Sequence, residues 1–421
     1  MKQTEIGMIP DDWEVKEIKE FADVTTGNKN TQDAQGNGKY PFYVRSPIVE
    51  RINTFSFDSE GLVTAGDGVG TGKVFHFVKG KFGLHQRAYL VHKFQNVDSK
   101  YFYYIFSQNF YERVHSMTAK SSVDSVRREM ITQMSIPLPP TLAEQQKIAK
   151  ALSDVDNVIS TLEKLITKKK NLKQGTMQQL LTGKKRLPGF APAVVALRQA
   201  QEPQLETPAT KQTELGEIPA DWEIVNINKT CTIKARIGWQ GLKSDEYLDT
   251  GDYLLITGTD FDNGFINWKN CNYVTEWRFK QDKNIQIKKG DVLITKDGTI
   301  GKVAFLNEVP MDGTLNSGIF VVRPKDSNII DSVFLSLIFK SFWFDNFLEQ
   351  ITSGSTIVHL YQKDFVKFNF ILPSKSEQIA IANVLSSMDK EIEALEAKLG
   401  KYRNLKTGMM QQLLTGKIRL K

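Results

Sequence analysis

The feature that most constrains this 421-residue chain is a repetition of its own sequence. The segment KQTEIGMIPDDWEV at 2–15 recurs as KQTELGEIPADWEI at 211–224, with 10 of 14 residues identical. A second segment, NLKQGTMQQLLTGKKRL at 171–187, recurs as NLKTGMMQQLLTGKIRL at 404–420. Because a tandem duplication sets the architecture, we expect two related halves rather than one continuous domain.

The two copies share their ends and differ in their middles. They are offset by 209 residues at the first repeated segment and by 233 at the second. Two further blocks align: the glycine-rich stretches 61–75 and 291–305, and the aromatic stretches 100–114 and 333–347, which predict a packing helix in each copy. A common scaffold with two different binding surfaces would give this pattern, and drift of surface loops would give it too.

Two stretches carry apolar residues at alternating spacings of four and three, the seam of a long heptad helix. The first seam is Ile148, Leu152, Val155, Ile159, Leu162 and Ile166, and the second is Ile381, Leu385, Met388, Ile392, Leu395, Leu399 and Tyr402. Prolines precede each seam, and a Thr-Gly pair at 182–183 and at 415–416 follows it. We predict two helices of about 40 residues and about 60 Å that pair antiparallel.

The rest of the chain predicts strands and turns, because short apolar runs such as GDYLLITGT at 251–259 are punctuated by Gly, Asn and Asp. The predicted fold class is α+β: two globular α/β domains, 1–142 and 213–375, separated by two long antiparallel coiled-coil helices in a pseudo-twofold tandem duplication. The helices fall within 143–187 and 376–421. The proline-rich residues 188–212 predict a linker.

Composition narrows the class of protein. With 40% hydrophobic and 10% aromatic residues, each half can bury a core, which excludes a disordered chain. Only Cys231 and Cys271 are present, too few for a disulfide framework and typical of a reducing, cytoplasmic compartment. We expect no signal peptide and no membrane segment. The net charge of +7 is concentrated in 143–187 and 376–421.

The motifs that suggest catalysis fail on inspection. The stretch GVGTGKV at 68–74 lacks the spacing of a phosphate loop, because Asp67 replaces its first glycine and Val74 its Ser or Thr; a strand-turn-strand is the better interpretation. PDDWEVK at 10–16 has the letters of a metal-dependent nuclease, but its second copy lacks the lysine. We expect Trp13 and Trp222 to fill equivalent core positions instead.

Metal and methyl-transfer chemistry are not indicated either. The five histidines, His76, His85, His92, His115 and His359, form no HExxH pair and have no cysteine neighbours. The sequence has no Asn-Pro-Pro-Tyr or Asp-Pro-Pro-Tyr tetrapeptide for amino-methylation. We therefore expect a protein that is not an enzyme, and that binds no cofactor and no metal.

The repeated motifs resemble a known family. The turn IGMIPDDWEV, the Pro-Leu-Pro-Pro-x-x-x-Glu-Gln start of the helix at 137–145, and its end MQQLLTGKKRLPGF at 177–190 look like the specificity subunit of type I restriction-modification systems. The resemblance covers the whole chain, although the second copy ends without the Pro-Gly-Phe of the first. It implies that 1–142 and 213–375 are target-recognition domains and that the helices space them.

The resemblance also implies a function. The chain would read a bipartite, asymmetric site in double-stranded DNA and direct two methyltransferase subunits and the restriction or motor subunits to it. Those partner subunits would hold the catalytic chemistry and would use S-adenosylmethionine, ATP and Mg. Each half-site would be read by polar and basic loop residues, because phosphate contacts position a protein whereas base edges specify the sequence.

Candidate base readers lie in the parts where the copies differ. In the first copy they are Asn28, Lys29, Asn30, Tyr43, Arg45, Ser46, His85, Gln86, Arg87, Lys120, Ser121, Ser122 and Arg127. In the second they are Arg236, Trp239, Gln240, Gly241, Lys243, Thr257, Thr259, Asp260, Lys296, Ser353, Gly354, Ser355, Thr356 and His359. Any one of them could equally be a solvated loop side chain. Lys168 to Lys170 favour a solvated helix face, or a partner or phosphate contact.

Two other functions remain open at this stage. A coiled-coil adaptor with two protein-binding ends would share the duplication and the helices. A self-sufficient DNA-modifying enzyme is disfavoured by the missing motifs. The half-site sequences and their spacing cannot be read from the chain.

Overall fold

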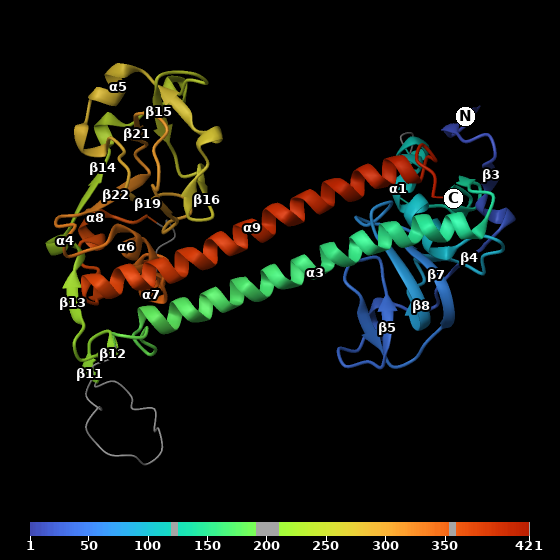
Figure 1. Cartoon of the computed structure of the whole chain (residues 1–421), viewed down its shortest axis with the longest axis horizontal. Helices are drawn as coiled ribbons and strands as arrows, with labels where there is room; N and C mark the ends of the chain where they lie inside the picture. Colours follow the sequence, from blue (N-terminus) through green and yellow to red (C-terminus); the bar gives the residue numbers. More distant parts are fainter. Residues whose placement is uncertain (119–124, 191–209, 353–358, 421) are drawn as a thin grey trace, which may run out of the picture. The chain divides into compact units, whose positions relative to one another are not determined.

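A computed structural model describes residues 1–118, 125–190, 210–352 and 359–420 (Figure 1). The chain divides into two compact units. Unit 1 consists of Met1–Ile166 and Leu395–Lys421, and unit 2 of Thr167–Ala394. Each unit thus combines one predicted domain with parts of both long helices, whereas the predicted boundaries set the helices apart as separate segments.

The two long helices are confirmed. Helix α3 spans Leu142–Leu181 and α9 spans Lys375–Leu413. Within unit 1, Leu162 and Ile166 of α3 form a buried cluster with Leu399 of α9.

Salt bridges show the direction in which the helices pair. In unit 1 they join Asp156 to Lys406 and Glu163 to Arg403, and in unit 2 they join Lys173 to Asp389 and Lys169 to Glu391. In each unit the partner number on α9 falls as the number on α3 rises. The pairing within each unit is therefore antiparallel, as the sequence predicts.

Unit 1 is built on one six-stranded sheet with the order β4-β9-β7-β8-β5-β6. All neighbouring strands are antiparallel except β5 and β8. The strands are β4 Asp23–Thr26, β5 Tyr40–Tyr43, β6 Glu50–Ile52, β7 Phe57–Ala65, β8 Phe75–Leu84 and β9 Ala88–His92. The β7-β8 hairpin confirms the strand-turn-strand interpretation of the glycine-rich stretch. Helix α1, Ser99–Thr118, packs its aromatic side chains on this sheet.

The remaining elements of unit 1 are short. They are β1 Lys2–Thr4, β2 Gly7–Ile9, β3 Glu14–Glu17, η1 Ile18–Glu20, η2 Thr31–Asp33, α2 Arg128–Thr132 and β10 Ser135–Leu138. Strand β10 pairs with β3, so the end of segment 1–142 returns to its beginning just before α3 starts.

Unit 2 distributes its strands over several sheets. The two largest have the orders β14-β22-β19-β20 and β18-β15-β21. Their strands are β14 Cys231–Ala235, β15 Tyr253–Ile256, β18 Asn272–Val274, β19 Val292–Thr295, β20 Val303–Phe305, β21 Gly313–Leu315 and β22 Ile319–Pro324. The β19-β20 hairpin corresponds to β7-β8, as the duplication predicts.

The other elements of unit 2 flank these sheets. The strands are β11 Thr210–Thr213, β12 Gly216–Pro219, β13 Glu223–Asn226, β16 Phe261–Asp262, β17 Phe265–Ile266 and β23 Asn369–Leu372. The short helices are α4 Ile227–Thr230, η3 Gly238–Gln240, η4 Ser244–Glu246, η5 Trp268–Asn270, α5 Glu276–Lys280, η6 Lys283–Ile285 and α8 Gln362–Phe365. Most of the predicted linker falls in 191–209, outside the described residues, and its last three residues belong to β11.

The aromatic block differs between the copies more than the alignment suggests. In unit 1 it forms the single helix α1, but in unit 2 it forms two helices, α6 Ser332–Ile338 and α7 Phe342–Thr352. The break falls at Ser341, whose amide and hydroxyl both donate to the carbonyl of Ile338. The Ser341 hydroxyl thus shares the carbonyl of Ile338 with the backbone at the point where the first helix ends.

The repeated ends meet at a buried tryptophan in each unit. Trp13 and Trp222 are both fully buried, which confirms their predicted core positions. The glycine after each long helix, Gly183 or Gly416, has a positive φ. An added Cβ there would lie 2.3 Å from Pro219 Cγ in unit 2 and 2.4 Å from the corresponding Pro10 atom in unit 1. Only glycine therefore allows the helix end to approach the repeated turn this closely.

Candidate nucleic-acid interface

Loops from distant parts of the sequence converge in unit 1. The amide of Gln86 donates to the carbonyl of Lys29, and the Gln86 side chain donates to Asn30. The amide of His85 donates to the carbonyl of Tyr43 at 3.0 Å. These contacts bring three of the predicted reader groups, around residues 28–30, 43–46 and 85–87, into one loop cluster.

A fourth loop, the glycine-rich turn between β7 and β8, completes this cluster. The amide of Gly66 donates to the carbonyl of Arg87 at 2.8 Å, and the carbonyl of Gly66 accepts from the amide of Val126 at 2.7 Å. Val126 directly precedes the exposed Arg127, another predicted reader. The predicted residues Lys120, Ser121 and Ser122 lie outside the described part of the chain.

The charged centre of the cluster is an acidic residue that the sequence argument did not select. Asp67 accepts from Arg45 Nη1 at 2.5 Å and from Arg87 Nη1 at 3.1 Å. Burial would raise the pKa of Asp67, but hydrogen bonds and charge from Arg45 and Arg87 lower it, so the carboxylate stays ionised. The signal that could have revealed it is the Asp-Gly pair in the same place in both copies, at 67–68 and 297–298.

Arg45 and Asp67 line an open cleft of about 690 Å³. Its lining includes Val44, Arg45, Ser46, Asp67 and Val69, and Val69 at the tip of the turn is 98% exposed. His76 lies beside it, with its Nε2 3.0 Å from the carbonyl oxygen of Ser46. Burial lowers the pKa of His76, so the ring is neutral near pH 7. The cleft therefore has the guanidinium group of Arg45 at its edge and the apolar side chain of Val69 at the tip of the turn.

Unit 2 repeats the same framework of backbone hydrogen bonds. The amide of Lys296 donates to the carbonyl of Gly318 at 2.8 Å, as Gly66 donates to Arg87. The amide of Leu360 donates to the carbonyl of Lys296 at 2.9 Å, as Val126 donates to Gly66.

The third bond of the framework is also repeated. The amide of Asn316 donates to the carbonyl of Ile256 at 2.9 Å, as His85 donates to Tyr43. The loops that carry Thr257, Lys296 and His359 are thereby gathered into a second loop cluster.

The side chains on this common framework differ. Gly318 stands where unit 1 has Arg87, and Gly258, two residues after Ile256, stands where unit 1 has Arg45. The aspartate is kept: Asp297 lies 2.5 Å from Nδ1 of His359. Besides Lys296 and His359, the second cluster presents hydroxyl groups, with Thr257 and Thr259 joined through their hydroxyls at 2.7 Å.

Arg236 requires a correction, because the structure does not leave it free to read a base. It is 2% exposed, and its guanidinium donates to the carbonyl of Leu315 and the hydroxyl of Thr314. Burial lowers its pKa. Arg236 therefore braces the loop that follows β14 against β21, and does not present its donors to solvent.

Other predicted readers are also partly structural. His85, Gln240 and Asp260 are buried, and Asp260 accepts from the amide and hydroxyl of Thr257. Gly241 ends η3 next to Gln240, and Lys243 precedes η4, where its amide donates to Glu246. The residues Ser353, Gly354, Ser355 and Thr356, and the side chain of Trp239, lie outside the described part of the structure.

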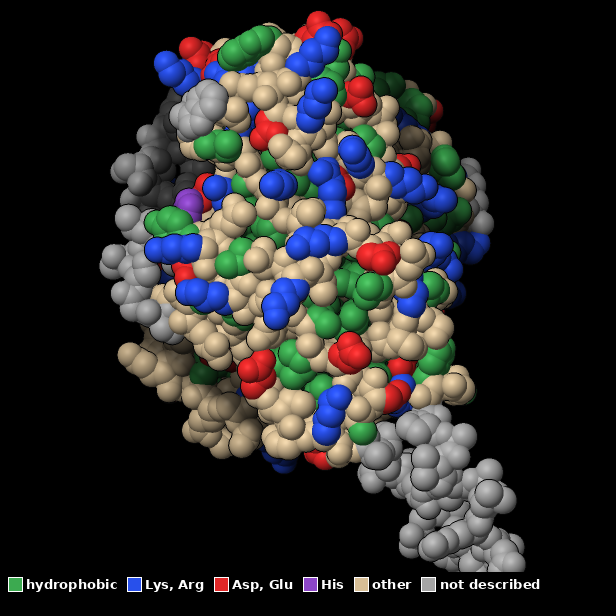
Figure 2. Space-filling view, turned by 90° about the vertical axis from the view of Figure 1, so that its left-hand side faces the viewer, with side chains coloured by type: hydrophobic (Ala, Val, Ile, Leu, Met, Phe, Trp, Pro, Cys, Tyr) green, Lys and Arg blue, Asp and Glu red, His purple; other side chains and the backbone are tan. Residues whose placement is uncertain are grey.

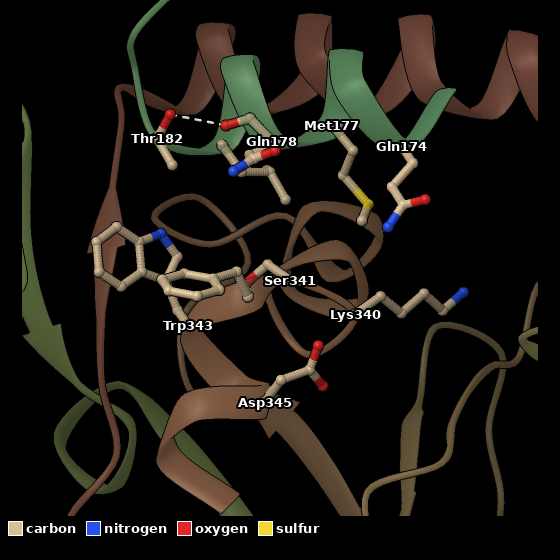
Figure 3. Close-up of a pocket in the computed structure, with 10 residues that line it drawn as sticks. Gln174, Met177, Gln178, Thr182, Lys340, Ser341, Trp343 and Asp345 are labelled. Carbon is tan, nitrogen blue, oxygen red and sulfur yellow. Dashed lines mark hydrogen bonds between the residues drawn. The ribbon is translucent and has the colours of Figure 1, made fainter. Parts of the chain in front are cut away.

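A second cavity, of about 270 Å³, lies in unit 2 between the last turns of α3 and the start of α7 (Figure 3). Met177 projects from α3 toward Ser341, and Lys340 and Trp343 extend to opposite sides of that serine. Burial lowers the pKa of Lys340 to about 8, and the charge of Lys173 adds to the effect. The aligned residue of unit 1 is Ser107, so this amine is not part of the duplicated plan.

Charge is distributed unevenly on the surface. On the face of unit 2 in Figure 2, Lys and Arg side chains gather across the middle, with fewer Asp and Glu side chains among them. Segment 213–375 has 21 acidic and 18 basic residues, so this positive face arises from placement rather than from net charge. Such a face favours contact with a polyanion.

Two further features of the described residues bear on other functions. Within them, no three His, Cys, Asp or Glu side chains are grouped so that they could hold a metal ion. None of the helices in that part of the chain combines the length and the apolarity that crossing a membrane requires.

Comparisons with known proteins agree with one another. The family model described as "Type I restriction modification DNA specificity domain" matches residues 10–174 and 219–401. The type I restriction enzyme MjaVIII specificity subunit of Methanocaldococcus jannaschii is 27% identical, over 98% of this chain and 94% of its own length. The putative MjaX specificity subunit of the same organism is 26% identical, over 100% and 97%. Among solved structures, the S subunit of a type I restriction-modification system from M. genitalium shares the fold, with a TM-score of 0.64, 16% identity and 98% of each chain covered.

Proposed function

The chain belongs to the type I restriction-modification DNA specificity family, and from this premise we propose that its two loop clusters each read one half of a bipartite, asymmetric DNA site. As a specificity subunit it supplies sequence recognition rather than catalysis. The adaptor and the self-sufficient enzyme are not favoured by this membership.

One observation carries the proposal. Three equivalent backbone hydrogen bonds join the loops in both units, yet the side chains on those loops differ, with Gly258 and Gly318 in place of Arg45 and Arg87. A shared framework with different polar groups supports two readers of different base sequences, because base edges are distinguished by the donors and acceptors that meet them.

The same proposal includes the partners. The chain would bring two modification subunits and the restriction or motor subunits to double-stranded DNA in the cytoplasm. Those subunits would use S-adenosylmethionine, ATP and Mg, whereas this chain would bind none of them. The duplicated sequence supports two copies of the modification subunit, because each unit offers an equivalent surface to its own copy.

The test is a segment replacement in the assembled complex. Residues 213–375 are replaced by the corresponding part of a relative, and the methylated motif is determined by sequencing DNA from cells that carry all subunits. We expect one half of the motif to change and the other to remain. A complex that marks no motif, or a replacement that alters both halves, would overturn the proposal.

A further inference from the structure

Two arginines that are 42 positions apart in the sequence converge on one carboxylate in unit 1. Arg45 Nη1 is 2.5 Å from Oδ1 of Asp67, and Arg87 Nη1 is 3.1 Å from Oδ2. Each arginine uses only one of its five N–H donors for this contact. The side chains of Arg45 and Arg87 remain 39% and 59% exposed, so both can offer further donors to a ligand, and Arg45 also lines the cleft.

The carboxylate between them is firmly positioned. Its neighbour Gly66 is hydrogen-bonded through its amide and its carbonyl, and Asp67 itself forms a β-bridge with Ser125. Gly68 on the other side has a φ of +78°. The turn therefore fixes where the carboxylate lies, and the carboxylate limits the rotamers of both arginines.

Stability does not explain this arrangement. Ion pairs with exposed arginines contribute only about 0–1 kcal/mol to folding. Two arginines around one aspartate also leave a net positive charge that folding does not require. By contrast, a guanine presents two acceptors, O6 and N7, to one arginine fork, and this contact demands a fixed guanidinium.

We propose that Arg45 and Arg87 form a guanine-reading pair, that Asp67 positions both of them, and that the half-site read by unit 1 therefore contains guanine. This inference rests on the proposed function and adds the chemistry of one half-site. Unit 2 has Gly258 and Gly318 at the corresponding positions, so its half-site is read without such a pair. Asp67 is a positioning residue, because it acts through the arginines and does not itself touch the base.

The first experiment leaves the protein unchanged. The complete complex is bound to duplexes that carry its methylated motif, with 7-deazaguanine replacing each guanine of the unit 1 half in turn. This analogue lacks the N7 acceptor. We expect affinity to fall about 5- to 100-fold at one or two guanines, the range of a bidentate arginine contact.

Protein variants then assign the contact. At the sensitive guanine, Arg45→Ala or Arg87→Ala should weaken binding to normal DNA and lose the response to 7-deazaguanine. Asp67→Asn should reduce discrimination against a mismatch at that guanine about tenfold while leaving binding to unrelated DNA unchanged or tighter, because a negative charge near the phosphates is removed.

A matched control is available on the same sheet. Asp23 also forms a surface ion pair, with Lys93, at the opposite end of β4 from the 27–30 loop. Asp23→Asn makes the same change of charge as Asp67→Asn. We expect it to leave discrimination against a mismatch at the sensitive guanine unchanged.

Three outcomes would overturn the inference while the proposed function stands. A unit 1 half-site without guanine on either strand would do so, and so would a complex indifferent to 7-deazaguanine. Arginine variants that lose the same affinity on every sequence would show phosphate contacts instead. A complex that marks no motif at all would overturn both the proposed function and this inference.

Discussion

The two loop clusters have the same backbone framework and different chemistry. In unit 1, Asp67 gathers two arginines, whereas in unit 2 the equivalent Asp297 contacts His359 and the arginine positions are glycines. Drift alone would be expected to disturb the framework as well as the side chains. The retained framework therefore indicates that these loops vary on a support that is itself held constant.

The contacts that join the end of each long helix to its unit can be compared in the same way. In each unit an arginine after the long helix joins two carboxylates: Arg186 binds Glu377 and Asp221 in unit 2, and Arg419 binds Glu144 and Asp12 in unit 1. We call each set an arginine clasp. The clasps differ at the tryptophan that each covers.

The indole N–H of the tryptophan has a hydrogen-bond acceptor in only one of the two clasps. In unit 2, Nε1 of Trp222 donates to Glu377 at 3.0 Å, whereas Nε1 of the buried Trp13 has no hydrogen-bond partner among the described residues of unit 1. Arg186 is also more deeply buried than Arg419, with 4% against 19% of its side chain exposed. The second clasp thus has more buried polar groups that depend on its glutamate.

The largest predicted effect comes from removing the glutamate of each arginine clasp. Glu377→Ala should destabilise unit 2 by about 3–5 kcal/mol, because a buried guanidinium keeps only the half-exposed Asp221 as its partner and the indole N–H of Trp222 loses its acceptor. Glu144→Ala should cost unit 1 about 1–3 kcal/mol less, since Arg419 can regain water. Hydrogen exchange of the full chain, followed peptide by peptide, reports each unit separately.

The exposed carboxylates supply the control for the clasps. Asp221 and Asp12 are 50% and 48% exposed and occupy the same place in each clasp. Asp221→Ala and Asp12→Ala should each cost less than about 1 kcal/mol and should do so equally. Equal losses for the two glutamate variants would contradict the difference we draw between the units.

Sequence reasoning predicted the elements that local patterns determine. The heptad seams and the residues that flank them placed α3 and α9 to within a few residues, because helix periodicity and glycine stops are local signals. The duplication itself predicted the paired hairpins and the buried tryptophans. The single packing helix expected for 333–347 was wrong, because the block forms two helices that part at Ser341, and the apolar pattern gave no sign of that break.

The candidate site was predictable only in outline. A polar, glycine-flanked stretch indicates a loop, and the structure does bring most of the selected loops together. The sequence pattern does not, however, distinguish buried polar side chains from exposed ones. Arg236 is buried by Thr314 and Leu315, which lie almost 80 residues later and are joined to it only by the fold. Asp67 was missed because it was considered only as the residue that replaces the first glycine of a phosphate loop, and its contacts with Arg45 and Arg87 depend on the fold.

The next prediction uses Lys340, which unit 1 lacks. Burial lowers the pKa of this amine to about 8 in the folded chain, below its ordinary value of 10.5. Between pH 8 and pH 10.5 the unfolded chain therefore binds more protons at this site than the folded chain, so the site adds stability as pH rises. Over that interval unit 2 should gain up to about 3 kcal/mol from Lys340.

The matched variant for this effect is Lys340→Met. The variant should be more stable than the parent at pH 7, and its stability should no longer rise with pH because of this amine. The measurement is thermal unfolding of both proteins from pH 7 to pH 10.5, compared as the difference between them. Ser107→Ala in unit 1 serves as the control and should change neither. If the stabilities of Lys340→Met and the parent change with pH in parallel, the amine of Lys340 remains hydrated in the folded chain and the prediction is wrong.

The smallest predicted effect concerns the salt bridges between the long helices. Asp156 with Lys406 in unit 1 and Lys173 with Asp389 in unit 2 occupy equivalent positions and are similarly exposed. In unit 1 alone, Asp156 also accepts a hydrogen bond from the hydroxyl of Tyr104 on α1 at 2.8 Å; the aligned residue in unit 2 is Leu337.

Asp156 should therefore couple segment 1–142 to the helix pair of unit 1 through a hydrogen bond, whereas Asp389 meets segment 213–375 only through the charge of Lys340. Removal of either lysine, by Lys406→Ala or Lys173→Ala, should cost about 0.5 kcal/mol. Asp156→Ala should cost about 1 kcal/mol more than Asp389→Ala, because the tyrosine hydroxyl loses its acceptor. In a double-mutant cycle, Tyr104→Phe should abolish that excess. If the excess persists when Tyr104 is Phe, the hydroxyl is not its source, and the two units join their helices in the same way.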